Sequence, residues 1–330
     1  MRYNNLIIKK RDAVMKKNSS TFIKIAFKRI LLILSCLIMT LAVCACKIAP
    51  TWLKVSTYNV WKCCDYPTYL ENKQINANAD KIVDFVLDEN IDVIALQEVD
   101  VNRITSSAPD SGPEKDQPKY ITDCLTDKSG ENYYYCFAPT LVRQAADTEY
   151  KNPYGYPTGT GLYGIAVISR FPIVDYRVVY LAFHDGYDEE NEKTYAMNGY
   201  ERRALLIVDI MVERQVVTVI NTHFDLDVES RAKSVKVLER ELENIDNPVI
   251  FMGDLNMTER EDSLTYIAEN LLTPVSDIGL PQFSFPSNKP NRQIDWIFVS
   301  EDIGYKDFTV INATFSDHCP LSVLVNIPEE

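Results

Sequence analysis

The sequence predicts an α+β fold in which two β-sheets pack face to face and helices cover their outer faces. Segments with a strand-like pattern outnumber segments with a helical pattern after residue 50. The helical patterns are far enough apart in the chain to cover different outer faces. Polar and acidic clusters recur at the ends of the strand-like runs, where a rigid sheet can hold side chains in a fixed geometry.

The first 46 residues differ from the rest and predict an export signal. They carry nine basic residues and one acidic residue, and Ile30–Cys46 contains no charge. A basic segment before a short apolar run is typical of a signal peptide, whereas a spanning helix needs about 20 apolar residues. Ala45 before Cys46 resembles the lipobox of bacterial lipoproteins, which predicts lipidation of Cys46 and a membrane anchor. Plain cleavage, giving a secreted protein, and an uncleaved signal anchor are alternatives. We therefore expect a signal over 1–46 and one domain over 47–330.

The charge of the folded region argues against long nucleic acids as partners. Without the first 46 residues, 25 basic and 46 acidic residues remain, which gives a formal charge of −21. A surface this acidic repels polyanions at long range. Five cysteines follow residue 46, and their odd number and irregular spacing argue against a disulfide scaffold.

The folded region is predicted to begin with a strand, a helix and a second strand. Leu53–Val60 alternates apolar and polar residues, which is typical of a strand. Ala77–Glu89 carries apolar residues at helical spacing, and Ile91–Leu96 is an apolar run typical of a buried strand. The polar segment 100–118 predicts a surface loop, followed by a helix near Tyr120–Thr126.

Strand-like segments dominate the rest of the chain. One helical pattern, Ser230–Leu242, interrupts them, and Gln144–Thr160 is a long loop that we expect at the rim of a substrate site. The expected strands are Tyr133–Ala138, Leu162–Ser169, Val174–Phe183, Arg203–Met211, Gln215–Asn221, Pro248–Met252, Phe308–Ala313 and Leu321–Ile327. With the opening elements, they make a sandwich flanked by helices.

The polar clusters predict a site that breaks a phosphate ester. That reaction needs an activated water, a cation that neutralises oxygen charge, and help for the leaving oxygen. Mg²⁺ suits the second task because it prefers oxygen ligands. Glu98, which follows a buried strand, is the candidate ligand, and Asn59 could hold the metal or a phosphate oxygen. A single strand-end carboxylate is as often merely solvated, so the prediction depends on the other clusters.

Two further clusters supply acid–base groups. Asp254 and Asn256 alternate along one extended segment, so both side chains can face the same side. His318 is the candidate general base because imidazole titrates near neutrality, and Asp295 is the candidate carboxylate that orients it. His223 would donate to a non-bridging phosphate oxygen, with Asn256 as a second donor.

The ordered set of motifs resembles the endonuclease/exonuclease/phosphatase superfamily from about Leu53 to Ile327. Each motif alone is weak, and their order is the specific signal. The segments that carry the resemblance are Thr57-Tyr58-Asn59, Leu96-Gln97-Glu98-Val99, Tyr163 to Arg170, Asn221-Thr222-His223, Gly253-Asp254-Leu255-Asn256, Ile294-Asp295-Trp296-Ile297 and Ser316-Asp317-His318.

The resemblance implies a four-layer α/β/β/α sandwich of mainly antiparallel sheets with a magnesium site at one edge. It implies that Glu98 and Asn59 bind metal or phosphate, that Asp317 completes the polar site at or near the metal, and that Mn²⁺ could replace Mg²⁺. Members differ in whether one or two ions act, and in whether the counterpart of Asp254 or of His318 activates water; we favour His318. Arg203 is a candidate substrate contact, although pairing with a surface carboxylate is the commoner role for such an arginine.

Together these observations predict an exported Mg²⁺-dependent phosphoesterase. Its expected substrate is a phosphodiester or a small phosphorylated molecule such as a phospholipid, a nucleotide or a sugar phosphate, and we expect a monomer. The alternatives are an extracellular nuclease and a non-catalytic lipoprotein that binds a ligand in the same site. The second alternative conflicts with the intact pair of a base and its orienting acid, which binding alone does not require.

Overall fold

The computed structural model describes residues 51–74, 79–103, 115–151, 153–181 and 201–328. The predicted signal over 1–46 and the predicted lipidation site Cys46 lie outside these ranges. Among the described residues, no helix combines the length and the apolar composition needed to span a bilayer.

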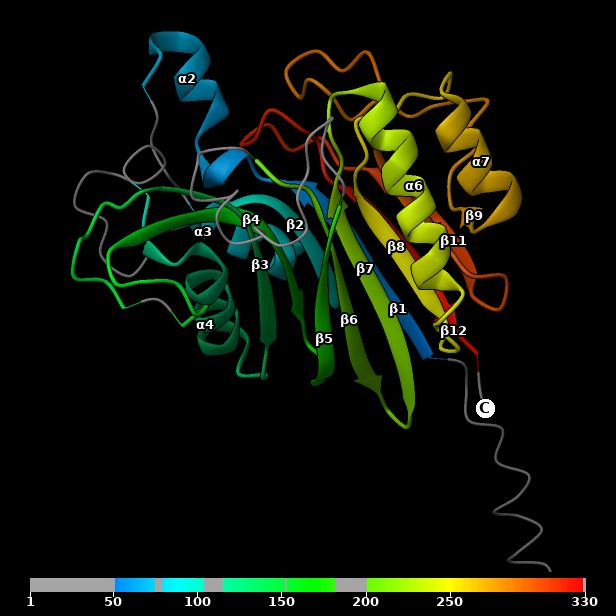
Figure 1. The fold of residues 1–330 in the computed structure, drawn as a ribbon, viewed down its shortest axis with the longest axis horizontal. Coiled ribbons are helices and arrows are strands. Elements are labelled where there is room, and N and C mark those ends of the chain that lie inside the picture. Colours follow the sequence, from blue (N-terminus) through cyan, green and yellow to red (C-terminus); the bar gives the residue numbers. More distant parts are fainter. Residues whose placement is uncertain (1–50, 75–78, 104–114, 152, 182–200, 329–330) are drawn as a thin grey trace, which may run out of the picture. The chain divides into compact units, whose positions relative to one another are not determined.

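The described chain forms two six-stranded sheets (Figure 1). The first has the strand order β11-β12-β1-β2-β4-β3 and the second has the order β5-β6-β7-β8-β10-β9. The strands of the first sheet are β1 (Thr51–Asn59), β2 (Val93–Val101), β3 (Tyr134–Gln144), β4 (Thr160–Ser169), β11 (Gly304–Val310) and β12 (Leu321–Ile327). Those of the second are β5 (Ile173–Tyr180), β6 (Ala204–Val212), β7 (Gln215–His223), β8 (Val249–Asp254), β9 (Thr273–Pro274) and β10 (Asp295–Val299).

Each sheet contains one parallel pair of strands. β1 and β2 are parallel and connected through α3 (Asp80–Asp88), and β7 and β8 are parallel and connected through α6 (Val228–Leu242). All other strand pairs are antiparallel. The prediction of two mainly antiparallel sheets is therefore confirmed.

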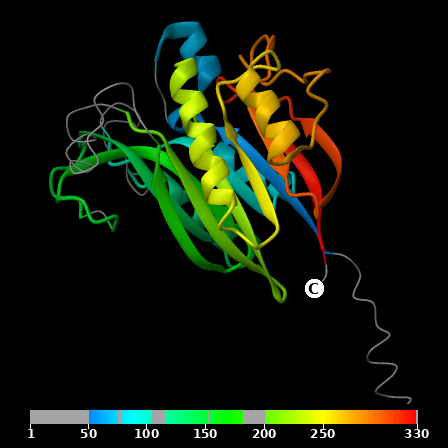
Figure 2. The same ribbon diagram turned by 45° about the vertical axis from the view of Figure 1, so that its right-hand side comes forward.

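Three apolar clusters separate four layers. The first lies between the sheets and contains buried residues from both of them, such as Ala95 and Ile250. The second packs α3 and α4 (Gln117–Ser129) against the first sheet, and the third packs α6 and α7 (Asp262–Asn270) against the second sheet. Figures 1 and 2 show these helix pairs on opposite sides of the sandwich. Because neighbouring strand residues face opposite sides, one buried strand supplies both a central and an outer cluster.

Local signals account for the helix ends. Asp227 accepts a hydrogen bond from the backbone N–H of Ser230 at the start of α6. Asp116 does the same for Lys119 at the start of α4, and Gly130 ends α4 with a φ of 75°. Such caps satisfy backbone groups that have no partner within the helix, and glycine adopts positive φ without steric cost.

Several bounds differ from the sequence-based expectations. β2 continues past Leu96 to Val101, and β3 continues into the predicted loop as far as Gln144. The short elements η1 (Trp61–Cys63), α2 (Tyr66–Asn72), α7 and β9 were not predicted. These elements are brief and depend on contacts with the rest of the fold, which periodicity alone does not reveal.

Candidate active site

The predicted site residues converge because both parallel strand pairs end at the same edge of the sandwich. Asn59 at the end of β1 pairs in register with Gln97 of β2. His223 at the end of β7 pairs with Asp254 at the end of β8, and Asp254 also pairs with Asp295 at the start of β10. Strand topology therefore delivers these side chains to one place.

A cavity of about 570 Å³ opens at this edge. It is lined by most of the predicted site residues together with charged groups from neighbouring loops. The lining residues are Glu98, Tyr163, Glu201, Arg203, His223, Leu226, Arg231, Asp254, Asn256, Thr258, Glu261, Phe285, Arg292, Ile294, Asp317 and His318.

A β-bulge directs Glu98 into this cavity. The register between β2 and β4 shifts between Gln97 and Val99, and Glu98 adopts a left-handed backbone with a φ of 59°. A bulge inserts one extra residue and re-aims its side chain, and non-glycine residues at positive φ are uncommon. Gln97 and Val99, the neighbours of Glu98 in the chain, are buried, whereas the carboxylate of Glu98 reaches the cavity.

Asn59 links the carboxylates of Glu98 and Asp254. Its Nδ2 donates to Glu98 Oε1 at 3.2 Å and to Asp254 Oδ2 at 3.0 Å. Its Oδ1 accepts from the backbone N–H of Trp61 at 3.1 Å, so the amide is held at both ends. In this orientation Asn59 positions two acids, while its role as a metal or phosphate ligand stays a prediction.

Asp254 is fully buried and is the centre of the site. Its Oδ1 accepts from the backbone N–H of Asn256 at 3.0 Å, and its Oδ2 lies 3.5 Å from His223 Nε2 and 3.7 Å from His318 Nε2. The preceding Gly253 is required by close packing, because a Cβ there would lie 2.1 Å from the backbone oxygen of Thr222.

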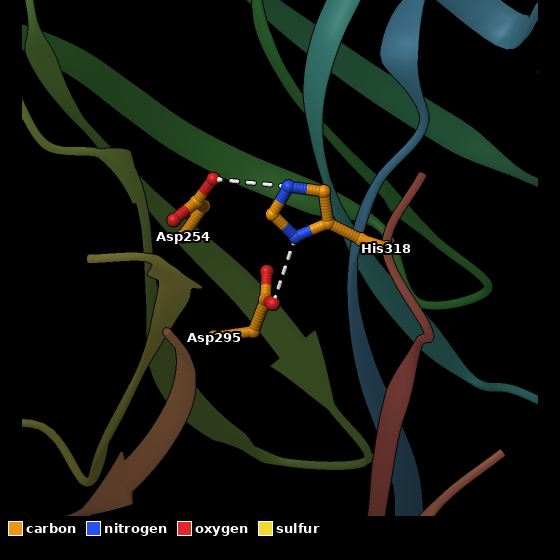
Figure 3. A group of neighbouring side chains, drawn as sticks. All are labelled: Asp254, Asp295 and His318. Atoms are coloured by element: carbon orange, nitrogen blue, oxygen red, sulfur yellow. Dashed lines mark hydrogen bonds and ion pairs between the residues drawn. The ribbon is translucent and has the colours of Figure 1, made fainter. Parts of the chain in front are cut away.

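His318 lies between two carboxylates (Figure 3). Its Nδ1 is 2.9 Å from Asp295 Oδ2, and its Nε2 faces Asp254. The hydroxyl of Ser284 also donates to Asp295 Oδ2 at 2.5 Å, which fixes the carboxylate in place. The geometry fits the predicted orienting role of Asp295.

The charges around His318 keep it protonated. Burial alone would lower the pKa of His318, but the carboxylates of Asp295 and Asp254 outweigh burial and raise it from 6.5 to about 10. Burial, reinforced by the nearby Asp295, raises the pKa of Asp254 to about 7. At neutral pH the proton therefore resides on His318, and Asp254 is the group able to accept another. The expectation that His318 is the base stays a prediction, and these pKa values favour the alternative, Asp254.

His223 stays neutral beside this charged group. Burial lowers the pKa of His223 well below its usual value, and the cations Arg203 and His318 lower it further. A neutral imidazole can donate one hydrogen bond to a phosphate oxygen without carrying charge. Asn256 lines the same cavity, with its Nδ2 held by the backbone oxygen of Phe224 at 2.9 Å.

Asp317 and Arg203 also line the cavity. The backbone oxygen of Asp317 accepts from the N–H of Ser287 at 2.7 Å, and burial raises the pKa of its carboxyl. Arg203 pairs with Glu201 at 2.6 Å on the cavity wall. The structure places Arg203 at the cavity with its guanidinium already paired with a carboxylate, and its role as a substrate contact stays a prediction.

Hydrogen bonds between buried side-chain amides connect the two sheets beneath the site. Gln97 Nε2 donates to Asn221 Oδ1 at 2.8 Å, and Asn221 Nδ2 donates to the backbone oxygens of Leu96 and Ala166. A buried polar group is costly unless it is paired, so this network fixes the spacing between β2 and β7. Both residues lie inside the motifs that predicted the site, but their structural role was not evident from sequence.

The oxygen-rich wall of the cavity fits a divalent cation. Glu98 and Asp317 contribute carboxylates, which are the ligands that Mg²⁺ and Mn²⁺ prefer. Asp254, Asp295 and His318 also have ligand atoms within 4.8 Å of one another. Both ring nitrogens of His318 face carboxylates there, however, so this group is an ion-paired triad. The set around Glu98 is the better metal site.

Sequence reasoning missed three residues beside the predicted ones. Lys62 Nζ lies 3.4 Å from Glu98 Oε2, and its backbone belongs to a left-handed turn over Trp61–Cys63. Ser284 holds Asp295, and Phe285 packs its ring 4.7 Å from the imidazole of His318. The proximity of Lys62 to Asn59 along the chain was the only available signal, and the other two contacts arise from loop folding.

Comparison with known proteins agrees with the fold and the motifs. The model of the Endonuclease/Exonuclease/phosphatase family matches residues 56–318. A search of curated proteins gives no match. A solved endonuclease/exonuclease/phosphatase from Beutenbergia cavernae DSM 12333 is 22% identical with a TM-score of 0.60, and the match covers 84% of this chain and 72% of that one.

Two solved proteins with named activities or ligands share the fold. A mannosyl-6-phosphatase from Bacteroides thetaiotaomicron VPI-5482 is 17% identical with a TM-score of 0.57, covering 83% of this chain and 99% of that one. The human Nocturnin catalytic domain with bound sulfate is 16% identical with a TM-score of 0.52, covering 84% and 97%. At these identities the likeness establishes the fold alone.

Proposed function

Because the chain belongs to the endonuclease/exonuclease/phosphatase family, and so is a metal-dependent phosphoric ester hydrolase, we propose that it is an exported, Mg²⁺-dependent phosphoesterase acting on a phosphodiester or a small phosphorylated molecule. One observation carries the proposal. Glu98, Asp254 and His318 line one cavity, and the first two share the amide of Asn59.

The residues divide the chemistry among themselves. A divalent ion held by Glu98, with Asp317 nearby, would neutralise phosphate charge. Asp254, with a pKa raised to about 7 by burial and by Asp295, accepts the proton of the attacking water. Protonated His318 faces the same space and donates to a phosphate oxygen or to the leaving oxygen. His223 and Asn256 add neutral donors that orient the phosphate.

The charge and the comparisons support a small substrate. The formal charge of −21 over 47–330 disfavours a long polyanion, and a cavity of about 570 Å³ suits a ligand of drug or nucleotide size. The similarity in fold to a mannosyl-6-phosphatase makes a sugar phosphate a reasonable candidate beside a nucleotide or a phospholipid head group. We propose that the protein acts as a monomer.

We further propose that the protein is exported through the signal over 1–46 and anchored by a lipid on Cys46. The basic segment, the uncharged run Ile30–Cys46 and Ala45 support this proposal. Metabolic labelling with a fatty acid tests it, with Cys46→Ser as the variant that should lose the label. A labelled Cys46→Ser variant would contradict the assignment of the modified residue.

A substrate panel tests the proposed activity. The full-length chain is incubated with phosphomonoesters, phospholipids, nucleotides and DNA, in Mg²⁺ or in chelator, with Asp254→Asn as the inactive control. We expect turnover of a small phosphoester that both the chelator and the substitution abolish. Turnover of DNA alone would replace the proposal with the nuclease alternative. Turnover of nothing would favour a ligand-binding protein.

A further inference from the structure

Three arginines line the cavity, and two of them are committed to carboxylates. Arg203 pairs with Glu201 at 2.6 Å. Arg231 makes a two-nitrogen contact with Glu261 Oε2, at 2.7 Å and 3.0 Å, and also donates to two backbone oxygens. These two guanidinium groups are held within the wall and have little capacity left for a ligand.

Arg292, the third arginine, is different. Its side chain is exposed at the cavity, and its guanidinium carbon lies 4.8 Å from the ring centroid of Phe285. Within the described part of the chain, no carboxylate pairs with Arg292. A guanidinium stacked on an aromatic face keeps its in-plane N–H donors available for an anion.

The backbone of Arg292 is fixed relative to the reacting groups. Arg292 and Phe285 exchange two backbone hydrogen bonds, at 3.1 Å and 3.2 Å. The ring of Phe285 packs against His318. The hydroxyl of Ser284 donates to Asp295, and the backbone oxygen of Ser284 accepts from the N–H of Cys319. The loop that carries Arg292 is therefore built into the wall that holds His318.

The cavity then has two places where an anion can bind, one beside His318 and Asp254 and one at the guanidinium of Arg292. A phosphate undergoing hydrolysis would lie beside His318 and Asp254. Arg292 and His318 contact the same phenyl ring, with the guanidinium carbon 4.8 Å and the imidazole centroid 4.7 Å from the centroid of Phe285. An exposed guanidinium with no carboxylate paired to it among the described residues is available to an anion that comes with the substrate.

We propose that Arg292 binds a second phosphate of the substrate, so that the preferred substrate carries two phosphate groups joined by a spacer. The proposal rests on the proposed function, because it places the first phosphate at His318. A guanidinium binds phosphate with two parallel charged hydrogen bonds, which are stronger than neutral ones. Arg292 is then a specificity-determining residue that contributes affinity for the distal group without touching the reacting bond.

Matched substrate pairs test this proposal. The full-length chain in Mg²⁺ is assayed with fructose 1,6-bisphosphate against fructose 6-phosphate, and with adenosine 3′,5′-bisphosphate against AMP. The two pairs differ in the spacer between the phosphates. We expect kcat/KM to favour the doubly phosphorylated member of at least one pair about tenfold, because charge-assisted hydrogen bonds to phosphate are stronger than neutral ones. Arg292→Gln should abolish the preference through KM, and Arg292→Lys should retain part of it.

Controls separate specificity from folding. Arg260→Gln, at an arginine whose side chain is 87% exposed and pairs with its neighbour Glu259, should keep the parental preference. Arg292→Gln should keep the parental thermal midpoint and should lose more kcat/KM on the doubly phosphorylated member of a pair than on the monophosphate. Three results would each overturn the proposal. They are an equal loss of kcat/KM on both members of a pair in Arg292→Gln, a preference for the doubly phosphorylated member that Arg292→Gln leaves unchanged, and the absence of that preference in the parent.

Binding to an inactive variant distinguishes this proposal from the proposed function. Calorimetric titration of Asp254→Asn with the same ligands measures the preference without turnover. A preference that Arg292→Gln removes in this background supports the second-phosphate site even if every ester resists hydrolysis. Equal binding of both members of each pair overturns it even if one of them is hydrolysed.

Discussion

Replacing Asp295 with asparagine should lower the pKa of His318 while leaving the imidazole in place. The rise of that pKa from 6.5 to about 10 corresponds to roughly 5 kcal/mol at about 1.4 kcal/mol per pKa unit. Asp295 is the largest favourable contributor, ahead of Asp254 and Asp317, while burial opposes the rise. One close opposite charge shifts a pKa by about 1–3 units, so we expect Asp295→Asn to lower the value by that amount.

Proton NMR of the imidazole C2 position measures this directly in chelator. The chain has three histidines, and His318→Gln assigns the resonance in question. The parental His318 should stay protonated to above pH 9, and the Asp295→Asn protein should titrate at least one pH unit lower. A parental resonance titrating near 6.5, or identical curves for the two proteins, would refute the assignment of an ion-paired imidazolium.

The same substitution should change how stability depends on pH. The folded state keeps the His318 proton up to about pH 10, whereas the unfolded chain releases it near 6.5. Unfolding therefore releases a proton in this window, and the stability from His318 is complete below 6.5 and is lost as pH rises towards 10. The slope from this group is at most about 1.4 kcal/mol per pH unit, and urea unfolding should show a smaller slope in Asp295→Asn.

Four further outcomes follow from the site and its supports. His318→Ala should lower kcat by at least about a hundredfold in steady-state assays, whereas Lys236→Ala, on the exposed face of α6, should leave kcat unchanged. Equal rates for His318→Ala and the parent would exclude a catalytic role for His318. Glu98→Ala should raise the Mg²⁺ concentration needed for half-maximal binding in calorimetry, and a superimposable titration would exclude Glu98 as a ligand. Lys62→Met should tighten Mg²⁺ binding by several-fold, because Lys62 competes for Glu98; weaker binding would contradict that competition. Gly253→Ala should lower the free energy of unfolding in urea by more than about 2 kcal/mol, because the added Cβ would meet the backbone of Thr222. Gly304→Ala should cost far less, because an added Cβ there would have no neighbouring atom closer than 3.6 Å.

Much of the fold was predictable because strand and helix periods are strong signals in this chain. The opening β-α-β unit, the helix over Ser230–Leu242 and the buried strand before Gly253 were all predicted near their observed positions. The site was predictable for the same reason, since Asn59, His223 and Asp254 are the last residues of regular strands. Register and the parallel pairs then bring them together without further information.

The remaining features depend on contacts between segments distant in the chain. The bulge that turns Glu98 into the cavity arises from pairing between β2 and β4, and a period-2 pattern cannot show it. The loop with Ser284, Phe285 and Arg292 has no periodicity, and its role follows from hydrogen bonds to Asp295 and Cys319. The pKa of His318 depends on Asp295 and Asp254, which lie on two strands far from the histidine in the chain, so the sequence around His318 does not show it.

A crystal structure with Mn²⁺ and inorganic phosphate tests the central claim most directly, namely that one metal and one imidazolium act on the same phosphorus atom. We predict an anomalous peak at the carboxylate of Glu98, with the phosphate in contact with both the metal and His318. A metal bound to His318 itself, or a phosphate bound away from the cavity of Glu98 and Asp254, would contradict it.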